Sequence, residues 1–470
     1  MKITRSLRWL RGLLALAAPA AAAAAETYPE LKYHAAPKPL PAGAATADWP
    51  HFLGPRTDAT TPETKLLDRW PAAGPAPVWE MATGDGYACP TLAAGRLVYF
   101  HRIGGRETVD CLEPETGKRY WRFDYAVSYE DRYGFSPGPR SSAVLAGGRV
   151  FTAGVTAQLH ALDLATGRVL WRRDLAAEFG VPQGFFGYGP TPAVWRDRLI
   201  VTVGGRGADG GRGTTVAALD QATGKTLWQA EDAWGADYAS PVIATLRGRE
   251  VVLAVVGGES RPAAGGLLVL DPQDGRVLER FPWRARVYES VIAGTPRAIG
   301  GAQVFLSECY EKGGVLLEFD AELKAKPVWT QRGFGLHWMV PVVRDGRMFG
   351  FAGRNPPDTE FKAVDLATGK IVWTDDTRFD EGGRTSSFFR GSLLEAGGRV
   401  FALGEDGVLG EFELTAQGAG LRQRVRLFAA QSAWTLPALS RGLLYVRQNE
   451  RDRRAGTGPR IICYDFRAEK

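Results

Sequence analysis

The sequence predicts an all-β fold, an eight-bladed β-propeller of four-stranded antiparallel blades with tryptophan-docking motifs, from three observations. A turn-and-tryptophan segment recurs about every fifty residues, a second hairpin pattern precedes it in each repeat, and glycine is unusually frequent. Glycine supplies 58 of 470 residues without a collagen period, which is typical of many tight turns between short strands. Two hairpins per repeat make four strands, the composition of one blade.

The recurring segment starts with an acidic residue and ends, after a glycine turn, in a tryptophan. Asp163 and Asp220 can accept hydrogen bonds from the amides that follow them, and Gly167 and Gly224 can supply the positive φ of a hairpin turn. A ring placed once per repeat can cover the seam between blades and bury on the order of 150–250 Å². We therefore expect a structural docking role for Trp79, Trp121, Trp171, Trp228, Trp329 and Trp373.

Eight inner strands are expected, one per blade. They start at Pro90, Ser142, Pro192, Pro241, Pro296, Pro341, Ser392 and Pro437. The count falls to seven if the weak repeat at 413–425 is not a blade. The last repeat lacks its outermost strand, and residues 77–80 are expected to supply it, because pairing the two ends removes the exposed edges of an open sheet.

The segments before the propeller have their own character. Residues 1–25 combine four basic residues with an alanine-rich apolar run and resemble a signal peptide, which predicts a periplasmic or secreted protein. Residues 26–75 are an extended segment rich in proline and alanine, and residues 76–470 form the propeller. No cysteine follows the expected cleavage site, so a lipid anchor is not expected. Without its basic leader the chain is close to neutral, which gives no reason to expect nucleic-acid binding.

The repeat resembles that of the pyrroloquinoline quinone (PQQ) propeller family over roughly residues 76–466. The family's motif A-x-D-x-x-T-G-x-x-x-W is matched by Ala161, Asp163, Thr166, Gly167 and Trp171, and again at 218–228 and 363–373. Residues 49–56 also look like the W-P-x-W-R-G-P-x-R leader of exported bacterial members, with departures at Phe52 and Leu53.

The resemblance implies two function classes. One branch consists of quinoprotein dehydrogenases, which hold PQQ and Ca²⁺ in the central channel and oxidise alcohols or sugars. The other is similar to BamB, an outer-membrane assembly factor that binds partner proteins and catalyses nothing. A fold alone does not choose between them.

The residues favour the binding class. The adjacent cysteine pair and the haem-attachment C-x-x-C-H that many enzymes of the first branch carry are both absent, and the five histidines lack metal-ligand spacing. We therefore predict no catalytic residue, no metal site and no cofactor; cofactor-binding residues are unknown, and PQQ with Ca²⁺ belongs only to the alternative of a PQQ-dependent oxidoreductase. The preferred hypothesis is a non-catalytic exported scaffold in the cell envelope. We expect mostly buried thiols at the four cysteines, Cys89, Cys111, Cys309 and Cys463. The alternative is one disulfide between two of them.

The loops that enter the inner strands are repeatedly aromatic. In a propeller such equivalent positions ring one mouth of the channel, and tyrosine, tryptophan and arginine dominate binding hot spots. The candidate rim for a ligand or partner comprises Tyr87, Arg140, Tyr188, Asp237, Tyr238, His337, Trp338, Phe389, Arg390 and Trp434. The alternative is that these aromatic residues only pack between blades where the channel narrows. The expected partner is a protein or a small molecule, and the chain is expected to be a monomer without a membrane span.

Overall fold

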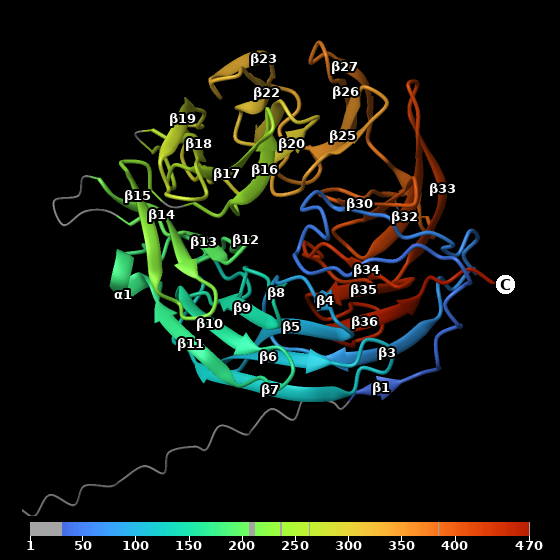
Figure 1. Cartoon of the computed structure of the whole chain (residues 1–470). Coiled ribbons are helices and arrows are strands. Elements are labelled where there is room, and N and C mark those ends of the chain that lie inside the picture. The colour runs from blue at the N-terminus through green and yellow to red at the C-terminus, as the bar shows by residue number, and fades with distance from the viewer. Residues whose placement is uncertain (1–30, 206–211, 236, 263, 384, 470) are drawn as a thin grey trace, which may run out of the picture.

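The described residues form eight four- or five-stranded sheets arranged around a central axis (Figure 1). The computed structural model describes residues 31–205, 212–235, 237–262, 264–383 and 385–469, so the expected signal peptide lies outside it. The eight-bladed prediction is confirmed, and the weak repeat is a blade. Each inner strand starts at, or one or two residues after, its expected position.

The first four blades follow one another along the chain, each with its strands ordered from the axis outward. Their strands are β4 (Thr91–Ala93), β5 (Arg96–Ile103), β6 (Arg106–Leu112) and β7 (Arg119–Ala126); β8 (Val144–Ala146), β9 (Arg149–Ala153), β10 (Gln158–Asp163) and β11 (Val169–Asp174); β12 (Ala193–Trp195), β13 (Arg198–Thr202), β14 (Gly213–Asp220) and β15 (Thr226–Asp232); and β16 (Val242–Leu246), β17 (Arg249–Val256), β18 (Gly266–Leu270) and β19 (Val277–Pro282).

Blades five to seven repeat the pattern. Their strands are β20 (Arg297–Ile299), β21 (Gln303–Glu308), β22 (Gly313–Phe319) and β23 (Ala325–Gln331); β24 (Val342–Arg344), β25 (Arg347–Ala352), β26 (Glu360–Asp365) and β27 (Ile371–Asp375); and β30 (Ser392–Ala396), β31 (Arg399–Leu403), β32 (Val408–Leu414) and β33 (Ala419–Arg426). A small hairpin, β28 (Phe379–Asp380) with β29 (Thr385–Ser386), precedes blade seven.

The eighth blade joins the two ends of the described chain. Its strands are β34 (Ala438–Ser440), β35 (Leu443–Gln448), β36 (Arg460–Asp465), β3 (Pro77–Ala82) and β1 (Lys32–Tyr33). Strand β3 pairs antiparallel with β36, with Trp79 opposite Cys463, so the expected closure of the ring is confirmed. The short strand β2 (Thr60–Thr61) adds to blade seven parallel to β30.

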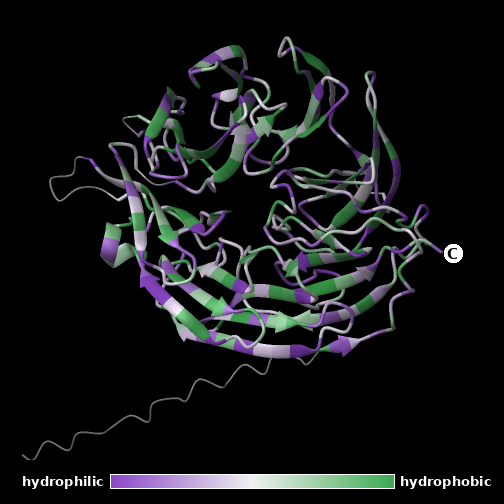
Figure 2. Ribbon diagram, in the orientation of Figure 1, coloured by the Kyte–Doolittle hydropathy of each residue, from purple (hydrophilic) through white to green (hydrophobic). Residues whose placement is uncertain are grey.

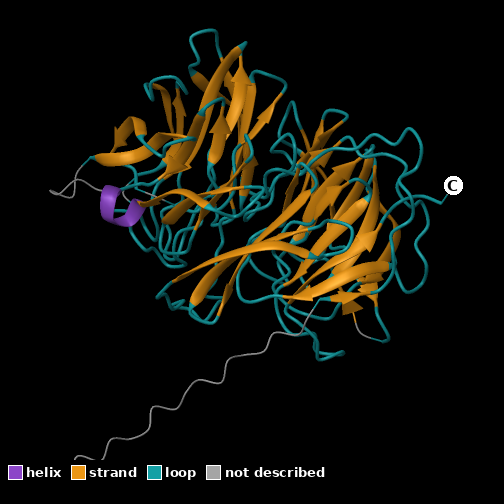
Figure 3. Cartoon of the chain, turned by 60° about the horizontal axis from the view of Figure 1, so that its bottom comes forward, coloured by secondary structure: helices purple, strands orange, loops and turns teal. Residues whose placement is uncertain are grey.

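Helix is scarce in the described ranges, where α1 (Leu175–Phe179) follows β11 (Figure 3). Asp174 caps it by accepting a hydrogen bond from the amide of Ala177, and Gly180 ends it with a φ of 69°. Within the described residues, no helix reaches the length and apolar character that a membrane crossing requires.

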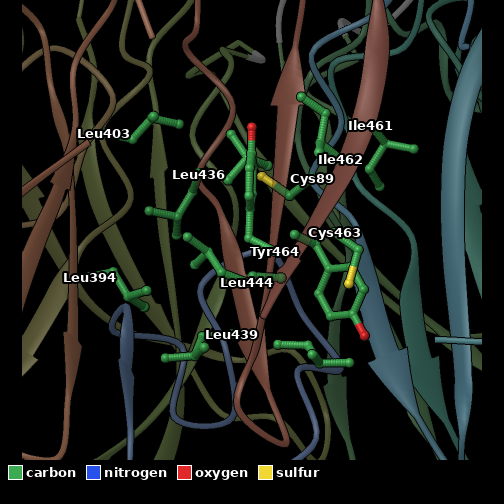
Figure 4. Close-up of a cluster of buried hydrophobic side chains, with 14 of the residues drawn as sticks. Cys89, Leu394, Leu403, Leu436, Leu439, Leu444, Ile461, Ile462, Cys463 and Tyr464 are labelled. Atoms are coloured by element: carbon green, nitrogen blue, oxygen red, sulfur yellow. The ribbon is translucent and has the colours of Figure 1, made fainter. Parts of the chain in front are cut away.

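The middle strands are apolar on both faces because each blade is covered by two neighbours. In β14, Val216 and Ala218 pack in the cluster shared with blade four, while Ala217 and Leu219 pack in the cluster shared with blade two. Hydrophobic residues accordingly concentrate on the strands (Figure 2). The cluster where blades seven, eight and one meet includes Leu394, Leu444, Ile461 and Tyr464 (Figure 4).

The repeat turn builds a seat for a tryptophan of the preceding blade. Asp163 Oδ1 accepts hydrogen bonds from the amide and the hydroxyl of Thr166, at 2.9 and 2.7 Å, which closes the turn. In the next repeat Gly224 has a φ of 71°, and a Cβ there would lie 2.7 Å from the ring of Trp171. Glycine is therefore required both by the turn and by the ring.

Each repeat tryptophan donates its indole N–H to a carbonyl in the turn of the next blade. The acceptors are Pro114 for Trp79, Leu164 for Trp121, Gln221 for Trp171, Pro272 for Trp228, Leu366 for Trp329 and Thr415 for Trp373, at 2.8–3.2 Å.

Two seams lack a repeat tryptophan and use other contacts. Between blades four and five, Glu279 stands at the tryptophan position and pairs with Lys324 of the next turn, with 2.9 Å between Oε2 and Nζ. Between blades seven and eight, Trp70 of the N-terminal segment packs on Phe401 and Phe466, with ring centroids 6.3 and 5.8 Å apart.

We predict that Trp228→Ala lowers the free energy of unfolding by about 3–5 kcal/mol, because it removes a buried ring at a seam. Trp228→Phe keeps a ring but loses the hydrogen bond to Pro272 and should cost less, about 1–2 kcal/mol. Urea denaturation monitored by circular dichroism measures both.

The control is Leu227→Ala, one residue earlier, where the side chain is 44% exposed and the expected change is within about 0.5 kcal/mol. Equal midpoints for Trp228→Ala and Leu227→Ala would contradict a seam role.

Candidate functional site

A cavity of about 430 Å³ lies on the propeller axis. Its wall includes a residue from the start of the inner strand, or just before it, in all eight blades, because the inner strands converge there. These residues are Cys89, Ser142, Thr191, Ser240, Thr295, Val340, Ser392 and Leu436. We call the loop-lined side of this cavity the channel mouth.

The N-terminal segment forms the floor of the cavity. Phe52 and Leu53 line it directly. Trp49 pairs with Leu92 of blade one, and the carbonyl of Pro50 accepts a hydrogen bond from the amide of Leu145 in blade two. The fully buried Trp49 packs against Gly54, which has a φ of 76°.

The same segment continues across the ring. Asp58 accepts a hydrogen bond from Arg297 of blade five at 3.0 Å, and β2 pairs with β30 of blade seven. The carboxylate of Glu63 then accepts from the amides of Arg441 and Gly442 in blade eight. Residues 49–63 therefore cross the channel from blade one to the opposite side, and the cavity opens toward the loops of the mouth.

Aromatic side chains form a nearly continuous chain around the mouth. In order they are Tyr310, His337, Trp338, Trp434, Phe135, Phe186 and Tyr238, with successive ring centroids 4.5–5.7 Å apart where they touch. Tyr87 packs against Trp434 at a tilt, with ring centroids 5.2 Å apart. Rings at these separations attract one another and leave edges and faces for a further ring.

Arg390 lies over Trp338 and Trp434, with its guanidinium carbon 5.2 and 4.9 Å from the ring centroids. Its Nε donates to Glu405 at 2.9 Å, and its Nη2 donates to the other oxygen of the same carboxylate. The indole of Trp434 donates to Glu405 as well, at 2.8 Å. Glu405 therefore holds the arginine and the indole in one arrangement.

The other two arginines of the cavity wall are also paired with acids. Arg140 donates to Asp131 at 2.6 Å and faces Tyr87 and Phe186. Arg354 donates to Glu289 at 3.2 Å and faces Tyr310. The lining residues contain no lysine. Each of the three arginines, the side-chain cations of this wall, therefore has a carboxylate partner.

The buried indole Nε1 of Trp338 has no hydrogen-bond partner among the described residues. The imidazole Nε2 of His337 lies 3.3 Å from the hydroxyl of Tyr310. Burial, with Arg390 and Arg354 nearby, lowers the pKa of His337 to about 3. The imidazole is therefore neutral at neutral pH.

The structure places seven of the ten predicted rim residues on the cavity wall. They are Tyr87, Arg140, Tyr238, His337, Trp338, Arg390 and Trp434.

The other three do not line the cavity. Tyr188 is buried between blades two and three and donates to the carbonyl of Thr202. Asp237 points into a buried network, 3.4 Å from Arg284, where burial raises its pKa well above the ordinary value. At Phe389 the backbone turns with a φ of 49°, and the preceding Phe388 takes the core position.

Four wall residues were not among the predicted rim residues, which were chosen by their distance along the chain before each inner strand. Phe135, Phe186, Tyr310 and Arg354 come from loops of different lengths and from the other set of hairpins, so they keep no constant offset from an inner strand. Aromatic pairs such as Phe185 with Phe186 in a proline- and glycine-rich loop were the available signal.

Neither a disulfide nor a metal cluster is found in the described ranges. All four cysteines are free, and burial raises the pKa of Cys89, which lines the cavity, to about 12. No group of three or more His, Cys, Asp or Glu side chains among the described residues is arranged to hold a metal ion.

Comparisons with known proteins identify one family and several solved structures with the same fold. The family described as outer membrane protein assembly factor BamB matches residues 105–375, more than half of the chain. BamB from Moraxella catarrhalis is 17% identical with a TM-score of 0.54, and the match covers 84% of this chain and 98% of that one. The comparison with curated proteins gives no match.

Two enzymes share the fold as well. The quinohemoprotein alcohol dehydrogenase from Comamonas testosteroni is 14% identical with a TM-score of 0.63, covering 91% of this chain and 82% of that one. A europium-containing methanol dehydrogenase is 12% identical with a TM-score of 0.62, covering 89% and 98%. Identities this low establish the fold alone.

We predict that His337 makes the protein less stable in mild acid. The unfolded chain protonates this imidazole below about pH 6.5, whereas the folded chain keeps it neutral down to about pH 3. The unfolded state therefore gains protons first, and the free energy of unfolding should fall by about 2 kcal/mol between pH 7 and pH 5 through this residue.

Urea denaturation at pH 7, 6 and 5 checks this, because His337→Gln should lose about 2 kcal/mol less than the native chain over that interval. The control is His34→Gln, which changes an exposed histidine directly after β1. If His337→Gln and the native chain lost the same stability, the imidazole would not be held neutral by its surroundings.

Proposed function

The chain belongs to the family of the outer membrane protein assembly factor BamB, and on that premise we propose that it is a non-catalytic binding module of the cell envelope. It holds a ligand or a group of a protein partner at the channel mouth. The observation that carries the proposal is the wall itself, where aromatic rings gather around three arginines whose charges are already matched. Surfaces rich in tryptophan, tyrosine and arginine supply most of the binding energy in protein recognition.

The ionisable groups of the wall support binding over chemistry. Cys89 is a neutral thiol at neutral pH, because burial raises its pKa to about 12. His337, with a pKa of about 3, is a weak base at neutral pH. Neither group is tuned toward the operating pH as a general acid, base or nucleophile would be.

The placement in the envelope draws on two supports. The basic and apolar residues of 1–25 predict export. The family name refers to assembly of outer-membrane proteins.

A PQQ-dependent oxidoreductase is the second candidate, and one observation favours it. Trp338 and Trp434, 5.3 Å apart, together with three arginines, offer a stacking surface and cations to a planar tricarboxylate. Two observations oppose it. The arginines are already paired, and Glu289 is the single carboxylate among the lining residues, whereas Ca²⁺ takes six to eight oxygen ligands.

Calorimetric titration with PQQ, with and without Ca²⁺, separates the two candidates. The binding module should give no calcium-dependent binding at micromolar concentration, which corresponds to about −8 kcal/mol. Calcium-dependent binding at micromolar affinity or tighter would replace our proposal with the enzyme, and dye-linked oxidation of alcohols and sugars would then be measured.

A second experiment tests the mouth as the binding surface. On an array of random 12-residue peptides, the native protein should bind a subset, and Trp434→Ala should lose at least about tenfold of that signal, as expected for a hot-spot ring. Tyr288→Ala, which removes an exposed ring that does not line the cavity, is the matched control. An equal signal from Trp434→Ala and Tyr288→Ala would contradict binding at the mouth.

A further inference from the structure

On the basis of the proposed function, we infer that the channel mouth takes an uncharged aromatic ring. The inference names the chemical class of the group that the cavity binds. It follows from the charge balance of the wall and the shape of the cavity.

The charge balance excludes a strongly charged group. Arg140, Arg354 and Arg390 each donate to a carboxylate, Asp131, Glu289 and Glu405 respectively. An anion entering the cavity would lose its water without gaining an unpaired cation, and a cation would meet arginines at three points of the wall. A neutral group avoids both costs.

The shape fits a flat group entering from one side. The floor consists of Phe52 and Leu53, and the wall near the mouth consists of rings from several blades. A volume of about 430 Å³ lies near the lower end of the range for small-molecule sites, which suits one fused ring system. A ring in this position would stack against Trp434 and Trp338 beside the guanidinium of Arg390.

The first test compares three probes that share one ring and differ in charge. They are N-acetyl-tryptophanamide, which is neutral, N-acetyl-tryptophan, an anion, and tryptamine, a cation. By ligand-observed NMR with the whole protein, the neutral probe should bind with a Kd of about 1 mM or tighter. The two charged probes should bind at least about fivefold more weakly.

The second test changes the charge of the wall. Glu405→Gln keeps an acceptor for the indole of Trp434 but leaves Arg390 without a carboxylate, so it should raise the affinity for the anionic probe by at least about fivefold. Glu413→Gln makes the same change of charge at an exposed position of β32 and should leave all three affinities unchanged. Thermal melting of both variants verifies that they fold.

The third test distinguishes the source of the ring with a capped pentapeptide that has a central tryptophan. Binding at least about tenfold tighter than the free amide assigns the ring to a partner polypeptide, whereas equal binding assigns it to a small molecule.

Failure of this inference is separable from failure of the proposed function. Tighter binding of the anion than of the neutral probe by the native protein would overturn the inferred class and leave binding at the mouth intact. The absence of binding by the neutral probe at 10 mM, roughly −3 kcal/mol, would overturn the class too, while mouth-dependent signal on the peptide array would still support the proposed function. If the neutral probe did not bind and the array signal did not depend on the mouth, both the inferred class and the proposed function would be overturned.

Discussion

The contact between one blade's indole and the next blade's turn is the interaction on which the structure depends. A blade is a narrow sheet that cannot bury both faces alone, and the ring gives each seam an apolar contact and a directed hydrogen bond at the outer edge. The two seams without a repeat tryptophan keep a contact at the same place. One uses the Glu279–Lys324 ion pair, and the other borrows Trp70 from outside the repeats.

The sequence predicted the features that recur in every blade but not the placement of individual loop residues. Strand order, blade number and the pairing of β3 with β36 followed from spacing, because each blade solves the same packing problem. Tyr188 and Phe389 show the limit, since an offset counted along the chain does not say whether a loop residue faces the axis or the seam. The acids that pair with the wall arginines were not predicted either, because Asp131 and Glu405 lie in loops without periodicity.

The channel mouth combines apolar character with rigid polar positions. Arg390 donates two hydrogen bonds to one carboxylate and lies over two rings, so it contributes a flat, fixed surface more than a free charge. A propeller scaffold does not fix a function, so in this chain the side chains that face the axis, rather than the blades, carry the functional information.

The meeting of β3 with β36 sets the order in which the molecule can be completed. Trp79 and Cys463 are opposite each other although nearly the whole propeller lies between them in the chain. As the polypeptide is synthesised, β3 cannot pair with β36 until the final hairpin has been made. Closing so long a loop is slow. Until then the molecule is an arc whose first and last blades each leave an apolar face uncovered. The ring can therefore close only after β36 has been made.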